Sequence, residues 1–340
     1  KIVCPPYDVI PPQRQQYFYE QDPRNFLHVL LPKDTSGEDK YILAGELFRK
    51  WIAEEILVRE EHPVFYFYSH QYVIKGERRI RLGFIGLMEL TLGRGAAYGH
   101  EHTRLEAKED RLRLMHQVKA NLSPIFIVFS DKKRIIQRIY QHYVLDKKPF
   151  IDIVDDQNCV HNLWRIDNPE AVSEIQSKMS GEEVFIADGH HRYEVACAYR
   201  DQMQQKFPTL EDPSFNYLMA YFTNTDSRGL VILAIHRLVK LDTPIGSEKF
   251  SALLRDYFEI EELKDKTRLF FLLEKSGRSE HVFGVYANKR YWLLRLKNIK
   301  IIDKIIPDKP LEFRSLDVSI LNQVIFKKIM GLNPDDKARI

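Results

Sequence analysis

The sequence predicts a mixed α/β fold in which α+β segments surround an α/β core. Two runs rich in β-branched and aromatic residues, 64–74 and 80–90, flank a charged turn and predict a β-hairpin. An entirely apolar run, Val184–Ala187, precedes apolar residues at helical spacing, which predicts a buried strand followed by a helix at 191–205. Apolar residues make up 44% and charged residues 29% of the chain, so we expect a folded globular protein.

The remaining elements follow from the spacing of apolar residues along the chain. The proline-rich start, CPPYDVIPP, predicts an extended segment, because proline fixes φ and disfavours helix in the residue before it. Before residue 160 we expect helices at 13–20, 39–55, 104–119 and 135–143, and strands at 25–31 and 125–129. After residue 160 we expect strands at 163–166, 216–223 and 229–239, helices at 169–179, 247–257 and 318–330, and a hairpin at 281–296.

These elements group into three predicted domains. Residues 1–150 form an N-terminal α+β domain that contains the hairpin at 64–90. Strands and helices alternate in residues 151–240, which predicts an α/β core. Residues 241–340 form a C-terminal α+β domain.

The overall composition argues against several classes of protein. The formal net charge of +3 is too balanced to predict binding to nucleic acid. No run approaches the roughly 20 apolar residues that span a bilayer, so we expect no membrane segment and a cytoplasmic protein. Cys4, Cys159 and Cys197 form no CxxC pair, which argues against a disulfide framework or a zinc ribbon. The oligomeric state is left open.

The strongest functional signal is DGHHR at residues 188–192, between the apolar strand and the helix. Asp188 or Gly189 is suited to capping the helix, and glycine lets the backbone approach a ligand closely. A helix N-terminus attracts anions, and Arg192 adds a guanidinium group that pairs well with phosphate. The turn therefore predicts an anion site, above all for phosphate.

Two other interpretations of this turn stay open. Asp188 could simply cap the helix, with His190 and His191 at the surface. The histidines could instead bind a metal, although neighbours on a helix point about 100° apart and helical metal pairs are normally spaced i, i+4. A metal-dependent hydrolase would combine them with His100 and His102.

Further charged residues could extend the site. Lys108 and Arg111 lie in a predicted helix, where they either belong to a solvated face or contact an anionic substrate. His236 and Arg237 lie near the end of the apolar run GLVILAI. Polar residues at the end of a buried strand often line a crevice, although an internal salt bridge would explain them equally well.

Seven motifs together resemble the DUF1015 family of bacterial and archaeal proteins. They are CPPYDVI, NFLHV, HEHT, KEDRL, NLSPIF, IADGHHRYE and GLVILAIHRLV. They cover nearly the whole chain, and their combination is more specific than any one of them. The resemblance therefore points to related proteins but does not imply an activity.

Residues 160–203 resemble the ParB/sulfiredoxin-like fold, especially its free-serine kinases, which carry a DGHHR-type phosphate loop. The resemblance implies a ParB-like core in residues 151–240 and a site for ATP or ADP with Mg²⁺ held by Asp188. It implies phosphate contacts from Gly189, His190, His191 and Arg192. Those kinases use a glutamate as base, for which this chain offers Asp167 or Glu101.

We therefore expect a nucleotide-binding phosphotransferase that acts on free serine or a similar hydroxyl-bearing metabolite. No Walker A sequence is present, so the phosphates would depend on the DGHHR turn. The alternatives are a non-catalytic nucleotide or phosphate sensor and the metal-dependent hydrolase. In each case the expected partner is a small molecule.

Overall fold

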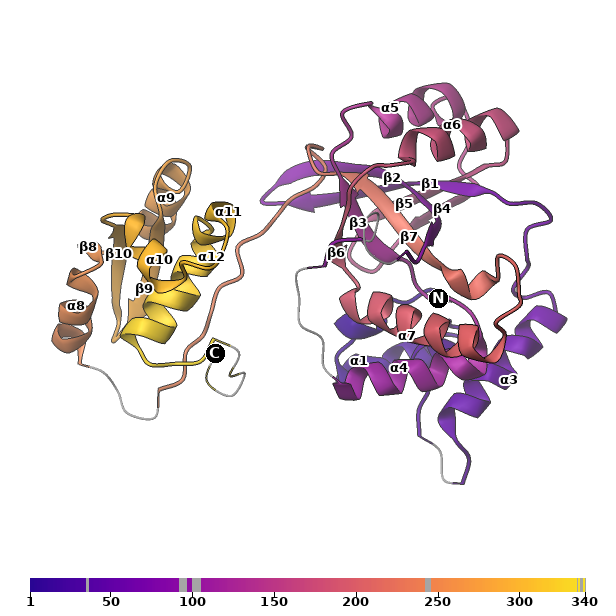
Figure 1. Cartoon of the computed structure of the whole chain (residues 1–340), viewed down its shortest axis with the longest axis horizontal. Helices are drawn as coiled ribbons and strands as arrows, with labels where there is room; N and C mark the ends of the chain where they lie inside the picture. Colours follow the sequence, from indigo (N-terminus) through magenta and orange to yellow (C-terminus); the bar gives the residue numbers. More distant parts are fainter. Residues whose placement is uncertain are drawn as a thin grey trace. The chain divides into compact units, whose positions relative to one another are not determined.

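The structure of the chain is a computed structural model that describes residues 1–34, 37–91, 97–99, 105–241, 246–334, 336 and 339. The chain forms two units, residues 1–232 and 233–340 (Figure 1). Each unit combines helices with a sheet, which confirms the predicted mixed α+β class. In the described part of the chain, no helix is both long and apolar enough to cross a bilayer.

The first unit is built on one seven-stranded sheet with the order β4-β5-β1-β2-β7-β3-β6. Only β3 and β7 pair in parallel, and the other neighbours are antiparallel. The strands are β1 (Phe65–Ile74), β2 (Glu77–Glu89), β3 (Ile125–Phe129), β4 (Ile151–Val154), β5 (Val160–Ile166), β6 (Val184–Asp188) and β7 (Tyr217–Asn224).

The predicted hairpin is confirmed as β1 and β2. Its turn residues, Lys75 and Gly76, both have positive φ, at 51° and 79°. Two successive positive φ values are the signature of a type I′ turn, whose twist suits a two-residue hairpin. The register therefore follows from the turn, and it pairs Ile74 with Glu77 and Tyr68 with Gly83.

Helices α5, α6 and α7 contribute to one core on this sheet. The side chains of Phe67, Phe84 and Ile127 pack there with residues of α5 and α6, and Ala196 of α7 belongs to the same core. Helix α4 packs against both α3 and α7. The α-helices of this unit are α1 (Pro12–Gln21), α2 (Leu27–Leu30), α3 (Lys40–Ala53), α4 (Leu105–Val118), α5 (Ile135–Ile139), α6 (Pro169–Met179) and α7 (His190–Lys206).

The second unit has a three-stranded sheet with the order β8-β10-β9. Phe258, Trp292 and Leu294 form its main core, and Leu293 belongs to a smaller core on the face toward α9. The strands are β8 (Phe258–Leu263), β9 (Val282–Ala287) and β10 (Arg290–Leu296), so the hairpin predicted at 281–296 is confirmed. The helices are α8 (Ser247–Arg255), α9 (Lys266–Ser276), α10 (Lys300–Ile305), α11 (Leu311–Arg314), α12 (Asp317–Ile320) and the π-helix η4 (Leu321–Ile329).

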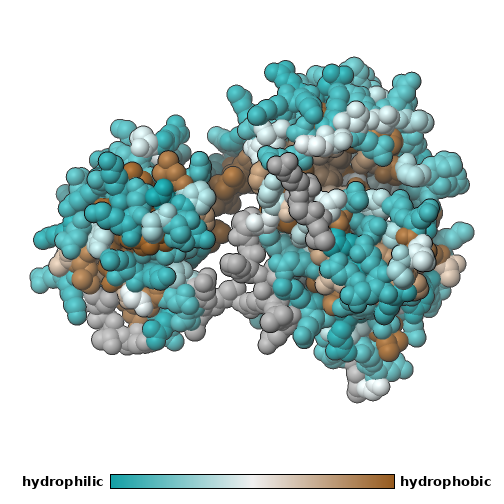
Figure 2. Space-filling model, in the orientation of Figure 1, coloured by the Kyte–Doolittle hydropathy of each residue, from teal (hydrophilic) through white to brown (hydrophobic). Residues whose placement is uncertain are grey.

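Two strand predictions are wrong. Residues 25–31 contain the short helix α2, which begins where the Asn25 side chain accepts a hydrogen bond from the Leu27 N–H at 3.0 Å. Residues 229–239 have no regular secondary structure, and Ile232 and Leu238 are each 91% exposed. Strand propensity is a local signal, whereas a strand exists only where another strand completes its hydrogen bonds. Apolar atoms of this segment show at the surface (Figure 2).

A substitution at Gly83 on β2 would test how tightly the sheet is packed. A Cβ atom at this position would lie 2.2 Å from the Phe222 carbonyl oxygen and 2.5 Å from Cε2 of Tyr221. We expect Gly83→Ala to lower the free energy of unfolding by about 2–3 kcal/mol, because the rigid backbone and ring must shift. Urea denaturation measures the change, with Gly246→Ala as a control in open space. Equal losses in the two variants would contradict this packing.

Candidate functional site

The turn between β6 and α7 is built around a glycine. Gly189 has a φ of 93°, a left-handed conformation that side chains other than glycine rarely adopt. A Cβ atom there would also lie 2.9 Å from Cγ2 of Ile125 and 3.1 Å from Cζ of Arg192. Gly189 therefore lets β6 turn directly into α7 and places the positive end of the helix dipole beside Asp188.

Arg192 ties three distant segments together at this turn. Its Nη2 donates to Oδ2 of Asp188 at 2.6 Å and to Oδ2 of Asp8 at 3.4 Å. Its Nη1 donates to the carbonyl oxygen of Pro124, just before β3. The side chain is 11% exposed, so these acceptors largely enclose it. Its Nε is buried without an acceptor in the described structure, and Nη2 becomes available to a phosphate group when the carboxylates move away.

The two histidines differ in their surroundings. His190 is 4% exposed, and a Cβ atom at Gly99 would lie 3.2 Å from its Cδ2. The backbone before Gly99 runs along β6, where Tyr98 N–H donates to the Val184 carbonyl at 3.0 Å. His191 is half-buried. His190 is therefore part of the packing at the start of α7 rather than a surface residue.

Lys108 and Arg111, predicted as anion ligands, are engaged with the protein. Lys108 on α4 forms an ion pair with Glu194 on α7. Arg111 is 9% exposed and donates hydrogen bonds to Asp110 at 2.6 Å and to the Leu30 carbonyl at 2.7 Å. Its guanidinium also lies 4.5 Å from the ring centre of Tyr7. Both side chains hold α4 to its neighbours.

A small cavity lies between these motifs. Its volume is about 50 Å³, which is room for a few water molecules but far below the roughly 300 Å³ of a typical ligand pocket. A nucleotide would therefore have to lie outside it, on the open side of the turn. The polar residues that line it are Tyr7, Arg111, Asn121, Ser123 and Arg192.

Four predicted site residues are not brought to this turn. Asp167 follows β5 and pairs with Arg165 at 3.4 Å. Four strands separate β5 from β6, a distance of about 24 Å at the usual strand spacing. His236 and Arg237 belong to the exposed segment 229–239 and line no strand end, which corrects that expectation. Glu101 lies outside the described residues.

The sequence argument missed a group of polar and aromatic side chains on the sheet, which we call the sheet-face cluster. Its members come from β1, β2, β5 and β7 and from the turn between β4 and β5. They are Tyr68, His70, Arg81, Asp155, His161 and Tyr221.

A chain of hydrogen bonds crosses this cluster. Nε2 of His161 lies 3.1 Å from Oδ2 of Asp155, and Nδ1 of His161 lies 2.5 Å from the Tyr68 hydroxyl. A carboxylate accepts the Nε2 proton, which leaves Nδ1 of the neutral ring to accept from Tyr68. Backbone N–H groups of Gln157 and Cys159 also donate to Asp155. The arrangement can accept a proton through Tyr68.

His70 and Arg81 form the other half of the cluster. Nη2 of Arg81 donates to Nδ1 of His70 at 3.2 Å, and the His70 ring stacks on His161 with 4.8 Å between ring centres. Burial, with the Arg81 charge as the next cause, lowers the pKa of His70 to about 4. His70 is therefore neutral at physiological pH.

The strand register places this cluster on the sheet face opposite the Phe67 core. Arg81 pairs with His70, Ile85 pairs with Tyr221, and Tyr221 pairs with Phe126. Directly paired residues point to the same side of a sheet. The register shifts where β3 meets β6, so this pairing does not continue the face to Asp188.

One signal in the sequence could have found part of this cluster. Tyr66, Tyr68, His70 and Tyr72 alternate along β1, and alternation in a strand means a shared face. Polar aromatic residues at every second position therefore indicate a sheet face that is not a purely apolar core. The partners on β5 and β7 follow only from the strand order.

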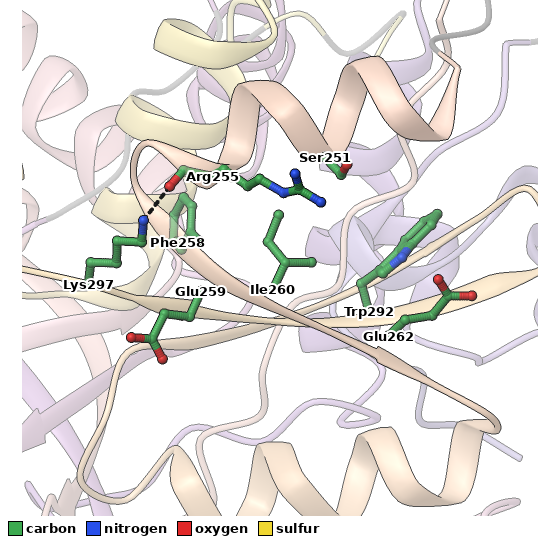
Figure 3. A pocket seen from close by; sticks show the side chains of 8 residues that line it. All are labelled: Ser251, Arg255, Phe258, Glu259, Ile260, Glu262, Trp292 and Lys297. Atoms are coloured by element: carbon green, nitrogen blue, oxygen red, sulfur yellow. Dashed lines mark hydrogen bonds between the residues drawn. The ribbon is translucent and has the colours of Figure 1, made fainter.

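The second unit holds a larger cavity, of about 370 Å³, beside α8 (Figure 3). Ser251 and Arg255 on α8 face Ile260 and Trp292 of the sheet, and Nζ of Lys297 donates to the Arg255 carbonyl at 2.5 Å. None of the residues predicted from the sequence lines it. Among the described residues of either unit, no three His, Cys, Asp or Glu side chains are grouped to hold a metal ion.

Comparison with known proteins gives one match. The family model described as "Protein of unknown function (DUF1015)" matches residues 1–319. No curated protein and no solved structure matches the chain.

The environment of His70 predicts how stability depends on pH. The pKa of His70 is below its ordinary value of 6.5 in the folded state, so folding favours the neutral ring. Its contribution to stability is present above pH 6.5 and is lost as the pH falls toward 4. We expect His70→Gln to weaken this pH dependence in urea denaturation. An NMR titration should give a higher His70 pKa in Arg81→Met, and an unchanged value would contradict the role of Arg81.

Proposed function

The chain belongs to the DUF1015 family, and we propose that its first unit is a phosphotransferase. It binds ATP or ADP beside the start of α7 and phosphorylates a small hydroxyl-bearing metabolite. One observation carries the proposal: four motifs distant in the sequence meet at one turn. They contribute Asp8 from CPPYDVI, Arg111 from KEDRL, Pro124 from NLSPIF and Arg192 from DGHHR.

The start of α7 supports the phosphate-binding part of the proposal. The positive φ of Gly189 brings Asp188 directly against the first turn of α7, where the helix dipole favours negative charge. The resemblance of DGHHR to the phosphate loop of free-serine kinases points to the same contact. The nucleotide would lie on the open side of Asp188, whose side chain is 59% exposed.

Two carboxylates fit the Mg²⁺ that a nucleotide would bring. Asp8 and Asp188 both bond to Nη2 of Arg192, so their oxygens lie within about 6 Å of each other. Mg²⁺ is usually bound by one or two carboxylates, with water and phosphate oxygens completing the shell. When bound, it would neutralise charge on the phosphates. Asp8 and Asp188 would then exchange Arg192 for the ion, and the released guanidinium would bind phosphate.

The proposal needs a proton acceptor for the substrate hydroxyl. Asp167 stands four strands away from the turn, so it is a poor candidate for this role. Glu101, the other carboxylate that the resemblance to free-serine kinases suggests, therefore keeps the role in the proposal.

Nucleotide binding can be measured by thermal shift. Mg²⁺ with ATP or ADP should stabilise the wild type, by about 2.7 kcal/mol at a hundredfold excess over Kd. Asp188→Asn should lose most of this shift, because it removes a carboxylate that meets the ion. Asp167→Asn is the matched control and should keep it. The proposal fails if neither nucleotide stabilises the wild type, or if both variants behave alike.

Turnover is a separate measurement. We expect phosphoryl transfer to L-serine or a related hydroxy compound, with at least a hundredfold loss in Glu101→Gln, the usual scale for a general base. The product is followed by ³¹P NMR. Nucleotide binding without any consumption would instead favour the non-catalytic sensor.

A further inference from the structure

We propose that Arg81 and Tyr221 form a binding site for a small carboxylate on the sheet face that carries the sheet-face cluster. The site is argued from that cluster alone and does not depend on the proposed function.

Arg81 is a cation without an acidic partner. Its guanidinium lies 4.7 Å from the ring centre of Phe126 and 5.6 Å from that of Tyr221. Its one hydrogen bond within the described residues goes to the neutral ring of His70, and its Nε is buried without an acceptor. A partly buried guanidinium without a negatively charged partner costs free energy unless an anion binds to it.

Tyr221 supplies a second donor. The residue is 6% exposed, and its buried hydroxyl lies next to the Thr223 and Arg81 side chains but makes no hydrogen bond of normal geometry in the described structure. Its ring leans over Gly83, where a Cβ atom would lie only 2.5 Å from it, so glycine is what permits this position. A buried hydroxyl without a partner typically marks a place where a ligand or water completes the bonding.

The chemistry of these donors favours a carboxylate. A guanidinium group offers its N–H donors in a planar fork that matches the two oxygens of a carboxylate. Arg81 is the one positive charge of the cluster, because His70 is neutral. Asp155, the acid of the cluster, is held by His161 and two backbone N–H groups. A single guanidinium beside that carboxylate suits a monoanion better than a phosphate dianion.

The surroundings of the site suggest the class of ligand. Phe126 and Tyr221 place aromatic rings against the Arg81 guanidinium. The Tyr68 hydroxyl, backed by His161 and Asp155, lies in the same cluster and can hydrogen-bond to a substituent of the ligand. The ligand class that fits is a small hydroxy or hydroxyamino acid. Arg81 on β2 stands three strand spacings from Asp188 on β6, about 14 Å, so this site is separate from the α7 turn.

The test measures binding of simple carboxylates without nucleotide. L-Lactate, L-serine and acetate are titrated by NMR into the full chain at constant ionic strength, with inorganic phosphate as a second arm. We expect Arg81→Met to weaken carboxylate binding on the order of 100-fold and Tyr221→Phe about tenfold, because bonds to a charged ligand are lost. Arg78→Met, on the same strand but the opposite face, should bind normally.

Several outcomes are decisive. Arg81→Lys keeps the charge without the planar fork, so intermediate binding in a folded variant would support the assignment even if Arg81→Met is unstable. Equal binding in wild type and Arg81→Met, no carboxylate binding, or binding of phosphate alone would overturn it. Carboxylate binding without any nucleotide shift would leave the site standing and the phosphotransferase proposal refuted.

Discussion

The hydrogen bonds of Arg192 are the constraint on which the first unit's candidate site depends. They join Asp8 near the N-terminus, the Pro124 carbonyl before β3 and Asp188 at the end of β6. A guanidinium group suits this task because its fork of donors is planar and permanently charged. The arrangement holds two carboxylates close together with one cation between them. It is therefore well set for an exchange of partners when an anion and a divalent cation arrive together.

The sheet faces have opposite characters, and this division shapes the protein's chemistry. One face buries Phe67, Phe84 and Ile127 under α5 and α6. The other face carries the sheet-face cluster, with stacked imidazoles, a phenol and a guanidinium. Polar groups at such positions cost free energy unless they are hydrogen-bonded. His161 meets that condition through Asp155 and Tyr68, whereas Nε of Arg81 and the Tyr221 hydroxyl do not, and for that reason we propose these two residues as ligand contacts.

The turn and the cluster are two separate polar regions of the first unit. The α7 turn offers a helix dipole, a glycine and exchangeable carboxylates, which suit phosphate with Mg²⁺. The cluster on β1 and β2 offers a guanidinium, a buried hydroxyl and a second hydroxyl backed by His161, which suit a small hydroxy acid. About 14 Å, or three strand spacings, separates Arg81 on β2 from β6.

The sequence by itself determined the elements whose causes are local. The hairpin follows from alternation and its turn, and the turn at Gly189 follows from an apolar strand, a glycine and a helical pattern. Only the tertiary structure decided which side chains meet. Asp8 reaches Arg192 across more than 180 positions, and His161 stacks on His70 because β5 pairs with β1. Strand pairing also explains why residues 229–239 form no strand and why Asp167 lies far from the turn. Strand pairing is a long-range interaction, and no local pattern of residues specifies it.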